Sequence, residues 1–524
     1  MTLSMFNGTI SREALEGYLS RAVTAADLVN STTLDDDLRM IGSIGAKFLG
    51  RASGVWLLEP DDDVHFRNSR ALAERVHEID PDIMLQTCIF EAVFTDVEKI
   101  EIPAWVFEAF GLSVERRAFR YADMLFDSKP QGFVWDGDGG IPNMNKLETQ
   151  LWFYYRAARY IDAGYEAIHM GQVHLYAAED HGFRKTAALF RKIRDYARGH
   201  ARRGIVLLDA HTHGVNINGT LLFDFHSMPY SRMPILDQPG DKLALVQEGF
   251  SEGGATVSGW DCDTLPMLME LDNWGGKFFG ESDGIPDERR AWMEWWGYDQ
   301  IAWFASQDAE SRDQFLEYAY RWTAVNNIHA YLQMPIRRTL GSCRVAMPAS
   351  GGGEGVTDVY QANRPGSGCP LGFGQEETIK RIWQSEEDLR GRASNPIPNA
   401  SYGAANDFDP ETGVKLPARV ILYGSFQHQV GAINFDSNSE TTRMYYTGNG
   451  LYRRTFVFPF RGAFDYAAAP YGTLSQTYSI DSYPRSGSST KSTLIIERDN
   501  EVVEFVFDFA NRTLTARVVE GLQP

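Results

Sequence analysis

GIVLLDAHTHG, at positions 204–214, is an apolar run that ends abruptly in one acidic and two imidazole side chains. A continuous apolar run between turn residues is typical of a strand that is buried on both faces, as in a parallel sheet. A stretch with helical periodicity precedes it at 183–202. Because strands that alternate with helices build βαβ units, this segment predicts one unit of an α/β fold.

The same pattern recurs over the first two thirds of the chain. Further helices are expected at 11–31, with Ser11 as the N-cap, at 33–44 and at 147–163. Other apolar runs that end in polar side chains occur at 46–53, 82–94, 167–176, 220–230, 265–275 and 330–338, and a short strand is expected near 301–306. Eight strands alternating with helices predict a (β/α)8 TIM barrel, whose polar strand ends meet at one mouth.

The character of the chain changes twice after the predicted barrel. We expect residues 1–340 to form the catalytic barrel domain and 341–414 a loop-rich connector that carries one short helix. After position 415 only short strand-like runs with turn signals follow. Regular short strands without helices are typical of an antiparallel β-sandwich, which we expect at 415–524.

Composition and charge narrow the classes of function. A net charge of −20 opposes nucleic-acid binding, because phosphate contacts need clustered Lys and Arg. No run reaches the roughly 18 apolar residues of a membrane helix, and the N-terminus lacks the basic and apolar parts of a secretory signal, so a cytoplasmic location is favoured. The four cysteines and the glycine runs match no zinc or nucleotide motif, so no cofactor is expected, and a homo-oligomer stays open.

Three carboxylates follow the apolar runs most closely. Asp209 ends one expected strand, Glu270 ends another, and Asp272 lies two residues further on the same face. Two carboxyl groups that face each other across a barrel mouth can cleave a glycosidic bond: one protonates the leaving oxygen, and the other attacks the anomeric carbon or activates water. These three residues are the candidate catalytic groups.

This layout resembles the barrel glycoside hydrolases, and among them the retaining α-glycosidases. The resemblance covers the architecture of 40–340 and the β-rich region after it, and it includes no family-specific motif. It implies a nucleophile at the end of the fourth strand, matched by Asp209, and an acid/base at the end of the sixth, matched by Glu270 or Asp272. It also implies an oligosaccharide or polysaccharide substrate.

Other polar and aromatic residues near the strand ends are candidate substrate ligands. Trp274, directly after the acidic cluster, could stack on a sugar ring. Glu91 follows an apolar strand, so burial could raise its pKa and make it a proton donor. The remaining candidates are Arg51, Gln172, His174, His211, His213 and Gln333.

The segment DAHTHG also resembles the His-x-His metal pair of the amidohydrolases. His211 and His213 at i and i+2 on a strand would face the same way and could bind one metal ion. In that family the pair belongs to the first strand, whereas here only about four strands follow, so we expect no metal. A metal-dependent hydrolase and a non-catalytic carbohydrate-binding protein are the two alternatives to a glycosidase.

Overall fold

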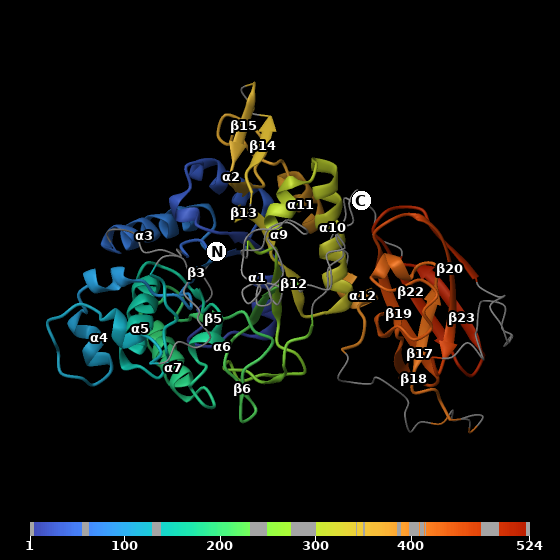
Figure 1. Ribbon diagram of the computed structural model, residues 1–524, viewed down its shortest axis with the longest axis horizontal. Coiled ribbons are helices and arrows are strands. Elements are labelled where there is room, and N and C mark those ends of the chain that lie inside the picture. Colours follow the sequence, from blue (N-terminus) through green and yellow to red (C-terminus); the bar gives the residue numbers. More distant parts are fainter. Residues whose placement is uncertain are drawn as a thin grey trace.

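The structure, a computed structural model, describes residues 5–54, 62–127, 138–230, 249–273, 300–341, 343–348, 350, 352–384, 389–397, 408, 413, 415–472 and 492–519. Helices and parallel strands make up the part of the chain up to about residue 397, and a β-rich part lies beside it, next to helices α10 and α12 (Figure 1). Within the described residues, no helix combines the length and apolar character needed to cross a membrane.

The first part is built on parallel strands with a neighbour on either side. One series is hydrogen-bonded in the order β13 (Met334–Thr339), β1 (Ala22–Ala25), β2 (Phe48–Gly50), β3 (Met84–Cys88), β4 (Ala167–His169) and β5 (Leu207–Asp209). A second series contains β8 (His226–Pro229), β11 (Met267–Glu270) and β12 (Ala330–Leu332). A parallel bridge between His211 and Ser227 links the end of β5 to β8, and β12 continues through Gln333 into β13.

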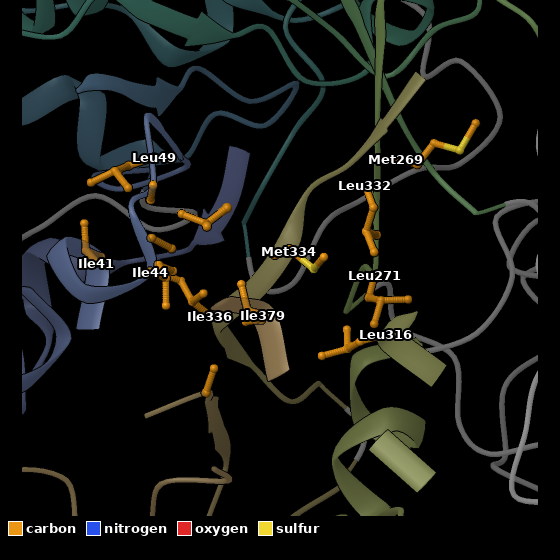
Figure 2. Close-up of a cluster of buried hydrophobic side chains, with 14 of the residues drawn as sticks. Ile41, Ile44, Leu49, Met269, Leu271, Leu316, Leu332, Met334, Ile336 and Ile379 are labelled. Carbon is orange, nitrogen blue, oxygen red and sulfur yellow. The ribbon is translucent and has the colours of Figure 1, made fainter. Parts of the chain in front are cut away.

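If β12 and β13 are counted as one strand, the two series contain eight parallel strands. One apolar cluster contains a residue from each of these strands, or, for β8, the residue directly before it. These residues are Ala22, Phe48, Met84, Ala167, Leu207, Phe225, Leu268 and Tyr331. The opposite faces of the strands pack against the helices in a second, larger apolar cluster. Figure 2 shows part of this second cluster, in which Leu49, Met334 and Ile336 of the strands approach Ile44 of α2 (Leu34–Ile44) and Ile379 of α11 (Glu376–Gln384). Burial on both faces explains why the strands read as continuous apolar runs.

Helices alternate with the strands along the chain. They are α1 (Arg12–Leu19), α2, α3 (Asp62–Ile79), α4 (Ala104–Ala109), α5 (Leu147–Asp162), α6 (Val173–Tyr176), α7 (Arg184–His200), α9 (Gln300–Ser306) and α10 (Ala309–Asn326). The Ser11 side chain caps α1 by accepting from the Ala14 N–H, as expected, and Asp308 caps α10 in the same way on Ser311. Four short strands, β6 (Asn216–Ile217), β7 (Thr220–Leu221), β9 (Gly254–Ala255) and β10 (Asp261–Cys262), form a separate small sheet.

Two predicted elements were wrong. The helix expected over 11–31 ends at Leu19, and the segment Ala22–Ala25 is instead strand β1, because its place between β2 and β13 buries all four residues. The strand expected near 301–306 is helix α9, whose apolar residues are buried among the outer helices. A short apolar run does not distinguish a buried strand from a buried helix by its periodicity.

Residues of the predicted connector add to the first core. Strand β16 (Val359–Gln361) pairs antiparallel with β13, while α11 packs near α2, and Trp383 joins the same apolar cluster. The hairpin β14 (Val345–Pro348) and β15 (Glu354–Thr357) projects from this side of the molecule (Figure 1). A short helix, α12 (Leu389–Ala393), precedes the β-rich part.

The β-rich part contains two antiparallel sheets around one apolar core. The first sheet has the order β17 (Val420–Gly424), β20 (Gly462–Pro470), β21 (Ser492–Ile496), and the second has the order β18 (Tyr445–Gly448), β19 (Leu451–Phe458), β22 (Glu501–Asp508), β23 (Thr513–Val518). Leu422 and Phe464 of the first sheet share this core with Phe456 and Phe505 of the second. Polar contacts join it to α10, including Arg321 Nη1, which donates to the Asn500 carbonyl at 2.9 Å.

Candidate active site

A group of buried charged residues lies at or just beyond the C-terminal ends of the parallel strands. Arg51 follows β2, Asp209 ends β5, and Glu270 ends β11. His211 and Asp272 lie two residues beyond their strands. Because the C-terminal ends of neighbouring parallel strands meet on one side, residues far apart in sequence become neighbours here.

Glu270 is the centre of this group. Its Oε1 accepts a hydrogen bond from Arg51 Nη2, and His211 Nε2 lies 2.8 Å away. Arg338 Nη1 lies 3.8 Å from Oε2, and that oxygen has no hydrogen-bond partner among the described residues. Burial alone would raise the pKa of Glu270, but the Arg51 charge, the His211 hydrogen bond and the Arg338 charge together hold it well below its usual range. Glu270 is therefore ionised at neutral pH.

Arg51 has an unusual backbone conformation. Its φ of 62° lies in the left-handed region, which is costly for a residue with a side chain. The Arg51 N–H donates to Gln86 Oε1 at 3.1 Å, while its guanidinium extends to Glu270. Strained backbone of this kind persists where the surrounding structure holds it, and it collects at functional sites.

Asp272 holds the second arginine of the group. Arg338 Nη2 donates to Asp272 Oδ1, and the Asn273 N–H donates to the same oxygen at 2.7 Å. Burial would raise the pKa of Asp272, but the Arg338 charge outweighs it and lowers that pKa below its usual value. Each arginine of the site is thus paired with one ionised carboxylate.

Asp209 has three side-chain hydrogen-bond partners. Gln86 Nε2 donates to its Oδ1 at 2.7 Å, and Ser227 Oγ donates to its Oδ2, also at 2.7 Å. His169 Nδ1, at the end of β4, lies 2.8 Å from the same Oδ2. Burial raises the pKa of Asp209 to about 7, against the opposing effects of the Ser227 hydrogen bond and the Arg51 charge.

Glu91 is a buried carboxyl group beyond the end of β3. Its Oε2 accepts a hydrogen bond from the Gln172 N–H at 2.9 Å. Burial raises the pKa of Glu91, although the hydrogen bonds from backbone N–H groups and the charges of His211 and Arg51 oppose the shift. Burial thus has the effect on Glu91 that the sequence led us to expect.

Gly171 makes room for this carboxyl group. Its φ is +55°, and a Cβ added there would lie 2.1 Å from Glu91 Oε2. Gly171→Ala should therefore displace Glu91 and lower turnover by on the order of 100-fold, since a misplacement of about 1 Å in an active site has that effect.

Gly182→Ala is the matched control for this substitution. Gly182 has a φ of +72° but no heavy atom within 4 Å of an added Cβ. Both variants should lose about 1 kcal/mol from the left-handed backbone, measured by thermal unfolding. Only Gly171→Ala should lose activity, and equal activity in the two variants would show that the position of Glu91 does not matter.

The structure places the remaining predicted ligands as follows. Gln172 is buried, and its Oε1 has no hydrogen-bond partner in the described part of the chain. His174 lies on α6, and its Nε2 is 3.0 Å from Thr212 Oγ1. Gln333 Nε2 donates to the Val23 carbonyl at 3.1 Å, so this amide is used inside the fold. The predicted platform Trp274 lies outside the described residues.

The contacts of His213 differ from those of His211. The His213 carbonyl accepts from the Glu252 N–H at 2.6 Å, whereas His211 faces Glu270. Strand β5 ends at Asp209, so the two histidines do not share a strand face as the i, i+2 argument assumed. Among the described residues, His211, Glu270 and Asp272 have ligand atoms within 4.8 Å of one another and could hold a metal ion.

Four residues of the site were missed in the list of candidates, and they are Gln86, His169, Ser227 and Arg338. His169 and Arg338 stand at the ends of apolar runs, which is the signal that selected Asp209 and Glu270. Gln86 is a polar residue inside a fully buried strand, and such a residue needs hydrogen-bond partners.

The strand positions of the carboxylates differ from those that the resemblance implied. Because β1 precedes the first expected strand, Asp209 ends the fifth parallel strand of the series and Glu270 ends the seventh. The match of Asp209 to a fourth-strand nucleophile, and of Glu270 or Asp272 to a sixth-strand acid/base, is therefore wrong. The roles of these residues have to be argued from their contacts.

No family model matches the chain, and no curated protein matches its sequence. Solved structures of glycoside hydrolases from several families show a weak likeness to the chain, with low TM-scores. The GH27 β-L-arabinopyranosidase Abp from Geobacillus stearothermophilus is 9% identical, with 86% of this chain and 87% of that chain covered and a TM-score of 0.38.

Two α-galactosidases show weaker likeness. The GH36 enzyme AgaA from Geobacillus stearothermophilus is 8% identical over 95% of this chain and 56% of that chain, with a TM-score of 0.34. TtGalA from Thermus thermophilus is 14% identical over 41% of this chain and 45% of that chain, with a TM-score of 0.27. The chain thus spans about half the length of both enzymes. Likeness at this level carries no argument about activity.

Proposed function

We propose that the protein is a glycoside hydrolase that acts on an oligosaccharide or polysaccharide at the C-terminal ends of its parallel strands. In this proposal the eight strands form a (β/α)8 barrel within 1–340, residues 341–414 connect the domains, and 415–524 form a β-sandwich. The two series of parallel neighbours, joined between β5 and β8 by a single bridge, support the barrel. So does the interior cluster, to which each strand position contributes a residue.

One observation carries the proposed activity: the pKa values of two buried carboxyl groups of one site are shifted in opposite directions. Arg51, His211 and Arg338 lower the pKa of Glu270, whereas burial raises the pKa of Glu91. Glycosidic bond cleavage needs one carboxylate and one carboxylic acid. Two carboxyl groups whose pKa values are pushed apart by their surroundings are the expected form of such a pair.

The contacts suggest how each group would act. Glu270 Oε2, which has no hydrogen-bond partner among the residues described, would attack the anomeric carbon and form a glycosyl–enzyme ester. Glu91 would give its proton to the leaving oxygen, and its carboxylate would then take a proton from the water that hydrolyses the ester. Arg51 and His211 hold Glu270 in place through Oε1.

A panel of p-nitrophenyl α- and β-glycosides of neutral hexoses and pentoses tests this function. The wild-type protein should release p-nitrophenol from at least one of them, and Glu270→Ala should not. Binding of sugars without release by the wild type would support the non-catalytic alternative. No release and no binding across the panel would contradict both carbohydrate proposals.

The spacing of His211, Glu270 and Asp272 favours one second candidate, a metal-dependent hydrolase. Against it, Arg51 and Arg338 contact the same carboxylates, and a divalent cation would have to bind beside two guanidinium groups. Chelation distinguishes the two proposals. Activity should survive EDTA, whereas loss on chelation and recovery with Zn²⁺ would favour the metal site.

A further inference from the structure

His169 and Asp209 form a buried pair that the proposed cleavage steps do not use. His169 Nδ1 lies 2.8 Å from Asp209 Oδ2. The His169 ring packs edge-on against the His211 ring, with the two centroids 4.6 Å apart. His211 in turn contacts Glu270. The pair is therefore one residue removed from the carboxylate that we propose as the nucleophile.

The neighbours of Asp209 fix where the protons lie. Gln86 Oε1 accepts from the Arg51 N–H, so the amide of Gln86 must turn its Nε2 donor toward Asp209. An ionised Asp209 is an acceptor only, and it accepts from Gln86, from Ser227 and from His169 Nδ1. With the proton on Nδ1, the Nε2 atom of a neutral His169 carries a free lone pair.

That Nε2 atom is buried and has no hydrogen-bond partner within the described ranges. Buried polar atoms without a partner are rare in folded proteins, and each one needs an explanation. Two further such atoms, Glu270 Oε2 and Gln172 Oε1, belong to the same site. A ligand rich in hydroxyl groups would supply hydrogen-bond donors to all three.

We propose that His169 Nε2 accepts a hydrogen bond from a hydroxyl group of the sugar bound at Glu270, and that Asp209 is the positioning residue that keeps the proton on Nδ1. This inference rests on the proposed glycosidase function. It gives Asp209 a supporting role through His169, since its oxygens already accept three hydrogen bonds. An Asp that holds a histidine in one tautomer is a known arrangement in hydrolases.

The test uses the p-nitrophenyl glycoside that the wild type cleaves, together with its monodeoxy analogues, at pH 8. His169→Ala should lower kcat/KM for the parent glycoside by about 10- to 100-fold. One monodeoxy analogue should be poorer for the wild type by a similar factor. With that analogue, His169→Ala should cause no further loss, because the hydrogen bond is already absent.

Two further variants separate positioning from a structural role. Asp209→Asn should lower kcat/KM for the parent, and the double variant Asp209→Asn/His169→Ala should be no worse than His169→Ala alone. His169→Gln, whose amide oxygen can reach toward the position of Nε2, should recover part of the activity. His65→Gln is the control, because His65 is similarly buried and contacts Tyr160 Oη at 2.8 Å instead of a carboxylate of the site.

The outcomes distinguish this inference from the function on which it rests. Equal losses for His169→Ala against the parent and every monodeoxy analogue would overturn the inference, because the histidine would then act on the fold and not on one hydroxyl. Losses matched by His65→Gln would overturn it as well. A wild-type protein that cleaves no glycoside would contradict the proposed function first, and the inference with it.

Discussion

Glu270→Ala should reduce the turnover of aryl glycosides by at least about 10⁴-fold, because it removes the group that forms the new bond to the anomeric carbon. Added azide should restore part of the activity, since a small anion can occupy the space left by the carboxylate. The product should be a glycosyl azide whose anomeric configuration is opposite to that of the substrate. Steady-state kinetics and NMR of the product provide the measurement.

The control for this experiment has to account for stability. Glu270 is buried beside Arg51 and Arg338, and removing one partner of a buried ion pair costs about 3–5 kcal/mol. Melting temperatures of Glu270→Ala and Asp272→Ala should therefore both fall. Azide should restore the activity of the first variant only. Rescue of Asp272→Ala, with none for Glu270→Ala, would place the nucleophile at Asp272.

Glu91→Gln should lower turnover by about 10²- to 10⁴-fold for phenyl glycosides, whose leaving group needs a proton. The loss should be much smaller for 2,4-dinitrophenyl glycosides, because dinitrophenolate leaves without protonation. In the wild type, activity should fall as the pH rises through the pKa of Glu91, because the acid must be protonated. Burial raises that pKa, so the fall lies above the usual range of a glutamate, and it should be absent from Glu91→Gln.

Glu148→Gln is a suitable control for Glu91→Gln. Glu148, on helix α5, is also a buried carboxylate, and its Oε1 lies 2.7 Å from Arg117 Nη1. Glu148→Gln should lower the melting temperature. Any loss of activity in this variant should be the same for phenyl and 2,4-dinitrophenyl glycosides. If Asp209→Asn shows the leaving-group dependence and Glu91→Gln does not, then Asp209 is the proton donor and the role proposed for Glu91 is wrong.

The sequence by itself determined the α/β character of the fold and the place of the candidate site. Apolar runs alternating with helical periodicity gave the parallel strands, because burial on both faces requires continuous apolar sequence. Reading the polar residues at the ends of those runs found Asp209, Glu270, Asp272, Arg51 and His211, which contact one another directly or through one intermediate residue. The local sequence pattern is enough to locate the end of a strand, because the end can be recognised without knowing which strands pair with it.

Only the tertiary structure decided the strand count and the partners of each side chain. Ala22–Ala25 is a strand because β2 and β13 lie on either side of it, and no local pattern marks that position. Gln333 resembles a site residue by its place at a strand end, yet its amide is bound to the Val23 carbonyl. Arg51 and Glu270 are 219 residues apart, and the protonation of each carboxyl group depends on such partners and on burial. Pairing across the fold is a long-range property, so a short window of sequence cannot specify it.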